Sequence, residues 1–130
     1  MRCLVGGVTA TELRTARVSD AAFDALVDGL TDPNPRVRWW CIQLLDHVPD
    51  HRAIEPIAAM LDDPIPRVRR NAAHALGCTA CKPEWSGGLP AKARAKLTAV
   101  ANGDPNPKVR AAASLALGRR PTAREYHTTI

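Results

Sequence analysis

The stretch DPNPRVRWWCIQLLD, which begins at Asp32, is the key to the fold because the chain repeats it twice more. The second copy is DPIPRVRRNAAHALG from Asp63, and the third is DPNPKVRAAASLALG from Asp104. The three aspartates are 31 and 41 residues apart (63 − 32 and 104 − 63). A helix-like run precedes each copy, so each unit is predicted to be a helix, a tight Asp-Pro turn and a second helix.

Turn chemistry marks the ends of these helices. The proline after each repeated aspartate stops the first helix, because the residue before a proline avoids the α region. Asn34 and Asn106 are predicted to cap second helices, and a proline follows each at the first helical position. Gly77 and Gly118 are expected to end second helices in the left-handed conformation.

The remaining signals complete the organisation of a single domain, 1–130. Thr9 and Glu12 form a capping box that predicts a short N-terminal helix over 8–18. Ser19 is predicted to cap the first helix of unit one, and Pro56 is expected in the first turn of the next first helix. The predicted segments are repeat one at 19–50, repeat two at 51–88 with an insert at 78–88, repeat three at 89–120 and a tail at 121–130.

Each second helix carries one apolar stripe with helical spacing. The stripe positions are Val37, Cys41, Leu44 and Leu45, then Val68, Ala72, Ala75 and Leu76, then Val109, Ala113, Ala116 and Leu117. Trp40 lies at the edge of the first stripe and is predicted to be a core residue. One helix pair cannot bury its stripe alone, so the three units are predicted to stack.

The pattern Asp-Pro-x-Pro-x-Val-Arg-x-x-Ala-Ala-x-x-Leu-Gly resembles HEAT-like repeats, especially the short type of the phycobilisome lyases. The resemblance covers about residues 20 to 120. It implies an all-α, armadillo-like α-solenoid whose second helices line an inner binding face. It also implies that the recurring Asp and Arg side chains form a ladder between units. These are Asp32, Asp63 and Asp104 with Arg38, Arg69 and Arg110.

The face of the second helices opposite the stripe is the predicted partner-binding surface. Its positions are Arg36, Trp39, Gln43 and Asp46 in unit one, Arg67, Arg70, His74 and Gly77 in unit two, and Lys108, Ala111, Leu115 and Gly118 in unit three. An exposed Trp39 beside Arg70 would suit a hot spot for a protein partner. The alternative is that Trp39 packs under the N-terminal helix and the arginines are merely solvated.

Three functions remain open on these residues. The first is a non-enzymatic scaffold that binds another protein through Trp39, Arg70 and His74. The second is nucleic-acid binding, since Arg36, Arg67 and Lys108 form a basic row and residues 87–130 hold eight Lys or Arg against two acids. The third is an accessory role beside a lyase or a DNA glycosylase, because Trp39, Asp46 and Arg70 are similar to the residue types that HEAT-like glycosylases use. No Gly-rich phosphate loop or nucleophile-elbow motif indicates an enzyme.

The cysteines raise a separate question. Cys41 takes the place of Ala72 and Ala113 and is expected in the core. Cys78 and Cys81 form a Cys-x-x-Cys in the insert, without the βαβ context of a redox motif. With His47 and His51 they could bind zinc at one edge of the solenoid. The alternative is a reduced thiol pair in a surface loop.

Composition favours a helical protein without a membrane-spanning helix. Hydrophobic residues make up 45% of the chain and aromatic residues 4%, so the core must be built mainly from aliphatic side chains. No apolar run approaches the ~18 to 20 residues of a membrane helix, and the N-terminus has no signal-peptide pattern. A cytoplasmic location is expected, with the thiols reduced.

Overall fold

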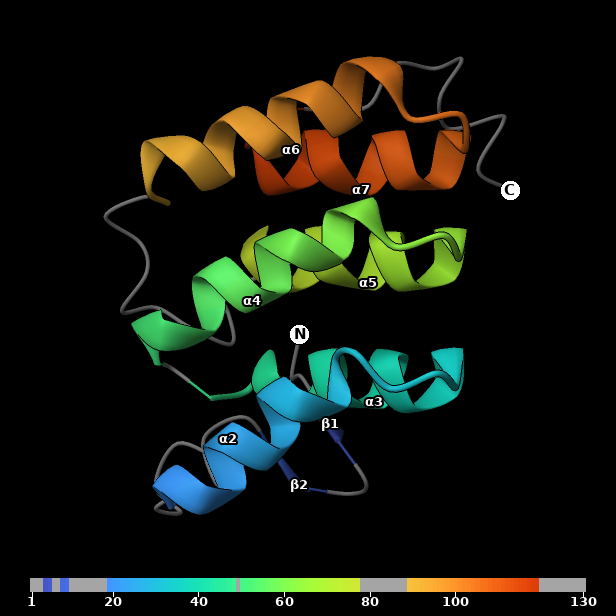
Figure 1. Cartoon of the computed structure of the whole chain (residues 1–130). Coiled ribbons are helices and arrows are strands. Elements are labelled where there is room, and N and C mark those ends of the chain that lie inside the picture. The colour runs from blue at the N-terminus through green and yellow to red at the C-terminus, as the bar shows by residue number, and fades with distance from the viewer. Residues whose placement is uncertain (1–3, 6–7, 10–18, 49, 78–88, 120–130) are drawn as a thin grey trace.

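The computed structural model describes residues 4–5, 8–9, 19–48, 50–77 and 89–119. Three helix pairs stack in sequence order, with the first helices in one layer and the second helices in another (Figure 1). The pairs are α2 (Asp20–Gly29) with α3 (Pro35–Leu45), α4 (Ile54–Ala59) with α5 (Pro66–Gly77), and α6 (Ala91–Gly103) with α7 (Pro107–Ala116). The predicted all-α solenoid is therefore confirmed.

Two kinds of shorter element accompany the pairs. The 3-10 helices η1 (His51–Ala53) and η2 (Met60–Asp62) flank α4 on either side. The strands β1 (Leu4–Val5) and β2 (Val8–Thr9) pair antiparallel. The helix predicted over 8–18 is therefore wrong at its first two residues, which pair with β1, and residues 10–18 lie outside the described part of the chain.

The predicted helix caps are present. The side chain of Ser19 accepts a hydrogen bond from the Ala22 amide at 3.1 Å. Asn34 and Asn106 each accept from the amide two residues later at 2.9 Å. Pro56 is the third residue of α4, in its first turn as expected. Local side-chain chemistry therefore starts these helices where the sequence indicates.

The two predicted glycine caps differ. Gly118 has φ +79 and ends α7 in the left-handed conformation, as predicted. Gly77 is the last residue of α5, and Gly118 alone has a positive φ among the described residues, so that prediction is wrong. A Cβ on Gly77 would overlap the backbone of Ala116. Gly77 is therefore needed for the close approach of α5 and α7, not for a turn.

The core lies between the two helical layers. Its largest fully buried apolar side chains are Ile42, Leu45, Ile57, Leu97, Val68 and Val109. All four stripe residues of α5 are buried, as are Cys41 and Leu45 of α3. The stripe residues Val37, Leu44, Ala116 and Leu117 are only partly buried. The middle repeat is thus the best covered, because it has a neighbouring repeat on both sides.

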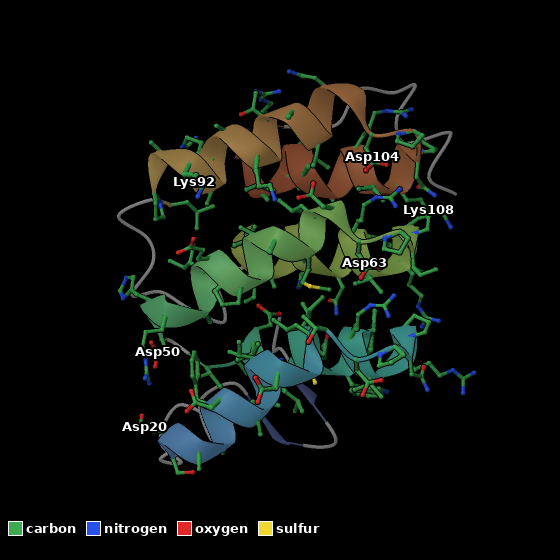
Figure 2. The ribbon with its side chains drawn as sticks, in the orientation of Figure 1. Asp20, Asp50, Asp63, Lys92, Asp104 and Lys108 are labelled. Carbon is green, nitrogen blue, oxygen red and sulfur yellow. The ribbon has the colours of Figure 1, made fainter. Side chains whose placement is uncertain are left out.

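An ion-pair ladder joins the repeats, as the resemblance implies. The Arg38 guanidinium binds Asp63 of the next repeat, with Nε to Oδ2 at 2.7 Å, and Arg69 binds Asp104 in the same way at 2.8 Å. Both arginines also donate to the carbonyl of the aspartate in their own turn. Figure 2 shows Asp63 and Asp104 at equivalent places one repeat apart. The side chains that fix each turn therefore also fix the spacing between repeats.

Candidate functional site: a pocket on the second-helix layer

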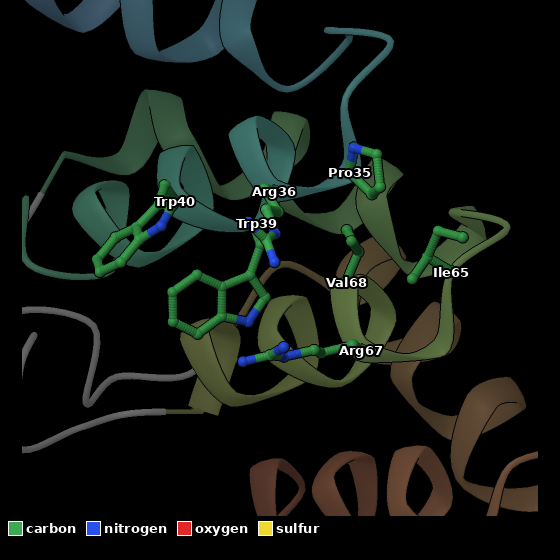
Figure 3. A pocket seen from close by; sticks show the side chains of 7 residues that line it. All are labelled: Pro35, Arg36, Trp39, Trp40, Ile65, Arg67 and Val68. Carbon is green, nitrogen blue, oxygen red and sulfur yellow. The ribbon is translucent and has the colours of Figure 1, made fainter.

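A pocket of about 430 Å³ opens between the first turns of α3 and α5. Two helices and the turn before α5 supply its walls, so the pocket exists only once repeats one and two are stacked (Figure 3). Its lining residues are Pro35, Arg36, Trp39, Trp40, Ile65, Arg67 and Val68. This site contains three of the seven residues predicted to bind a partner, namely Arg36, Trp39 and Arg67.

The exposure of the two tryptophans differs from the predicted one: Trp40 is more exposed than expected, and Trp39 is less exposed. Trp39 is partly buried against the core, with the Arg67 guanidinium 5.4 Å from its ring centroid. Trp40, predicted to be in the core, is 50% exposed. The two rings meet edge to face, with centroids 4.8 Å apart and planes at 88°. Together they form an aromatic corner of the pocket.

The position equivalent to Trp40 in repeat two is Asn71, which is buried and donates to the Trp39 carbonyl of the preceding repeat at 3.0 Å. The same position of the repeat is therefore covered in one copy and exposed in the other. The helical spacing alone could not show this, because it places a residue on a face without saying what covers that face.

Ile65 is a site residue that the sequence interpretation missed. It is 37% exposed and lines the pocket at the start of α5. Repeats one and three have a capping asparagine at the same position, Asn34 and Asn106. An isoleucine cannot accept the capping hydrogen bond, and exposing it to water is unfavourable. The sequence signal for this site residue was therefore the presence of Ile in repeat two where the other two repeats have Asn.

The basic residues of this face are exposed as expected. Arg36, Arg67 and Lys108 occupy the second position of α3, α5 and α7, one in each repeat. Arg70 and His74 follow on the exposed side of α5, and Gln43 on α3 is half-buried. Their role in partner binding stays a prediction.

Two other positions assigned to this face are buried. Asp46 is 1% exposed and lies 3.6 Å from the Nε2 atom of His74. Ala111 is buried in repeat three. Ideal helical spacing therefore assigns Asp46 to the wrong face: it is the C-cap of α3, and its carboxylate lies beside His74 of the next repeat. Trp39, Asp46 and Arg70 therefore do not share one open surface, as a glycosylase-like trio would require.

A second pocket, of about 310 Å³, lies in the first-helix layer between α4 and α6. Ion pairs cross it from one helix to the other. Lys96 contacts Asp62, and Lys92 lies 3.9 Å from Glu55 (Figure 2 labels Lys92). This pocket therefore lies at the contact between repeats two and three, and ion pairs between the two repeats cross it.

The residues predicted to bind zinc are only partly described. His47 is 1% exposed, and His51 is exposed at the start of η1. Cys78 and Cys81 lie outside the described residues. Among the residues that the structure describes, no three His, Cys, Asp or Glu side chains are grouped to hold a metal ion. Zinc binding stays a prediction.

Cys41 is a core residue, as predicted. Burial and, to a lesser extent, the nearby Asp32 carboxylate raise the pKa of its thiol. Both effects disfavour the thiolate, which is the nucleophilic and metal-binding form. The raised pKa therefore keeps Cys41 in its thiol form at neutral pH.

The stacked helix pairs and the arginine-aspartate ladder define a helical-repeat α-solenoid. Residues 23–118 match the family described as HEAT repeats, and the chain belongs to that family. The match identifies HEAT repeats in general, so the likeness to the phycobilisome lyase type stays a prediction. No curated protein matches the chain. In the described part of the chain, none of the helices combines the length and apolar character needed to cross a bilayer.

Proposed function

We propose that this HEAT-repeat protein is a non-enzymatic scaffold that binds another protein through the second-helix layer. One observation carries the proposal: a pocket between α3 and α5 leaves Trp40 and Ile65, two large apolar side chains, partly exposed. Tryptophan and arginine are enriched at the energetic centres of protein interfaces. HEAT repeats are generally protein-interaction scaffolds, which supports the same function.

Capture from native cell extract, compared across variants, tests the scaffold function. Wild-type protein, Trp40→Ala and Arg94→Ala are immobilised, and the bound proteins are identified by mass spectrometry. Arg94 is the control because it is an exposed residue on α6, in the first-helix layer and outside the pocket. A partner retained by wild type and Arg94→Ala but lost by Trp40→Ala is the expected result. Equal recovery by all three proteins contradicts it.

Nucleic-acid binding is the alternative, because Arg36, Arg67 and Lys108 are exposed one repeat apart. The salt dependence of the affinity separates the two functions. Binding to phosphates releases counterions and weakens steeply with salt, whereas contact with an apolar pocket weakens little. A steep salt slope with single-stranded or duplex DNA, together with no protein partner, would favour the alternative.

The zinc hypothesis is tested on protein purified without added metal. It predicts about one equivalent of zinc per chain, four ligands being usual for such a site. The double variant Cys78→Ser/Cys81→Ser should lose that metal, whereas Cys41→Ala should keep it, because Cys41 is buried in the core. Metal-free wild-type protein whose thiols all titrate after unfolding, with no effect of a chelator, ends the hypothesis.

A further inference from the structure

We propose that the pocket between α3 and α5 receives one large apolar side chain from an acidic segment of a partner protein. The proposal rests on the protein-binding function and specifies the chemistry of the bound segment. The apolar lining of the pocket, an unusual residue at its edge and the charge around it each support the proposal.

The pocket walls are suited to an aliphatic or aromatic side chain. Pro35, Trp39 and Trp40 form one wall, and Ile65 and Val68 form the other (Figure 3). The volume of about 430 Å³ is within the range of about 300–1,000 Å³ that is usual for ligand sites. An apolar side chain placed there would cover apolar area that the pocket now exposes to water.

Ile65 indicates that the pocket is not a by-product of stacking. The same repeat geometry is reached with asparagine in the other two copies, where the side chain caps the second helix. In repeat two the cap is replaced by an apolar side chain at the edge of the pocket. An isoleucine cannot supply the side-chain cap that asparagine gives the helix that follows, and it adds apolar surface at the edge of the pocket.

The surroundings of the pocket are positively charged. The helices α3, α5 and α7 contain no Asp or Glu, and four of their Arg and Lys side chains are exposed. They are Arg36, Arg67, Arg70 and Lys108. The Asp63 and Asp104 carboxylates in the adjacent turns are bound by Arg38 and Arg69, and Asp32 accepts from the Asn34 amide.

A row of exposed cations beside an apolar pocket selects a segment with carboxylates next to its apolar residue. Arg36 and Arg67 lie at the pocket itself, so acidic residues directly flanking the inserted side chain would meet them first. Such complementarity speeds association and fixes the register of the bound segment. Because Arg67 already covers the ring of Trp39, that ring is not a free platform for stacking a nucleic-acid base.

Fluorescence anisotropy with three labelled peptides tests the proposal. The first peptide has a central Leu flanked by glutamates. In the second the Leu is replaced by Ser, and in the third the glutamates are replaced by Gln. The first peptide should bind at least about tenfold more tightly than either of the others, because each loses one of the two contributions.

Four protein variants locate the binding. Trp40→Ala and Arg67→Glu should each weaken the first peptide by about tenfold or more. Arg36→Glu provides a second charge variant that leaves the contact between Arg67 and Trp39 in place. Arg94→Glu on α6 is the matched control, because it makes the same charge change at an exposed position away from the pocket. Circular dichroism verifies that each variant is folded.

The outcomes separate this proposal from the proposed function. Equal affinity for the three peptides, or equal loss with Arg94→Glu and Arg67→Glu, overturns the acidic-segment proposal. If a captured partner needs Trp40 but the acidic peptide does not bind, the scaffold function stands and the acidic-segment proposal fails. A single-stranded DNA probe that binds more tightly than the peptide and depends on Arg67 overturns both.

Discussion

At the level of single residues, Ile65 connects stability to binding. It occupies the position from which Asn34 and Asn106 cap α3 and α7, and it leaves the α5 amides without a side-chain acceptor from that position. An N-cap hydrogen bond is worth about 0.5–2 kcal/mol. The protein therefore forgoes that stabilisation at the one turn that borders its pocket.

Replacing Ile65 with Asn should raise stability and weaken partner binding. The asparagine side chain would accept from the Arg67 amide, as Asn34 does from Arg36. We expect the free energy of unfolding to rise by about 1 kcal/mol, measured by urea denaturation followed by circular dichroism. Ile65→Ala is the control, because it removes the same apolar contact with the partner without adding a cap. If Ile65→Asn is no more stable than Ile65→Ala, the capping argument is wrong.

At the level of helices and repeats, Arg69 in the middle repeat and Arg110 in the third repeat make different ladder contacts. Arg69 donates to the Asp63 carbonyl in its own turn and to the Asp104 carboxylate in the next repeat. Arg110 makes the equivalent bond to the Asp104 carbonyl at 2.7 Å. Within the described residues it has no carboxylate of a following repeat. The two arginines therefore differ by one buried ion pair.

Arg69→Met should destabilise the protein more than Arg110→Met. Both variants lose the bond to the local carbonyl, but only Arg69→Met leaves a buried carboxylate, Asp104, without its cation. Removing one partner of a buried pair costs about 3–5 kcal/mol. Urea denaturation at neutral pH measures both differences. Equal losses for the two variants would show that the inter-repeat pairs contribute little to stability.

The packing of α5 on α7 gives a second test at this level. An alanine at Gly77 would overlap the backbone of Ala116, which cannot move aside as a flexible side chain can. Gly77→Ala is expected to cost about 1–3 kcal/mol of unfolding free energy. Gly103 is the control, because it ends α6 and a Cβ added there would have no other atom within 4 Å. There alanine should stabilise by about 0.4–1 kcal/mol, because it restricts the unfolded chain without strain in the folded one. Thermal unfolding should show a lower melting temperature for Gly77→Ala and a higher one for Gly103→Ala. A more stable Gly77→Ala would contradict the close approach of α5 and α7.

At the level of the whole molecule, one polar cluster ties repeat one to repeat two. Arg52, in η1, contacts Asp50, reaches Asp20 of α2 at 3.2 Å and lies over the Phe23 ring at 4.5 Å. The hydrogen bonds from Arg52 hold the pKa of Asp50 below its ordinary value of 3.8. The charged form of Asp50 is therefore favoured in the folded state relative to the unfolded chain.

This cluster makes part of the stability dependent on pH. Because the folded-state pKa of Asp50 is lowered, its contribution is fully present above its unfolded pKa and is lost as the pH falls through the folded pKa. Asp50→Asn should therefore be less stable than wild type at pH 7, and the difference should shrink at pH values below 3.8. Asparagine can still cap η1, so the cap is held constant. Denaturant midpoints of both proteins from pH 2 to 7 measure the difference in stability. A difference that does not change with pH would show that the charge of Asp50 does not contribute to it.

The repeat, and with it the fold, could be established from the amino-acid sequence alone. Three copies of one motif specified the number of helix pairs and the caps at Asn34 and Asn106, and the resemblance to HEAT-like repeats implied the arginine-aspartate ladder. These features are local or recur once in each repeat, so they can be read without knowing what each face contacts.

Which side chains are open to a partner depended instead on how the repeats stack. Stacking left Trp40 uncovered, partly covered Trp39 with Arg67, buried Asp46 and made Gly77 a packing contact rather than a cap. Each of these depends on the neighbouring repeat, because helical spacing assigns a residue to a face while stacking decides whether that face is covered. The pocket between α3 and α5 belongs to this second group, since neither helix forms it alone.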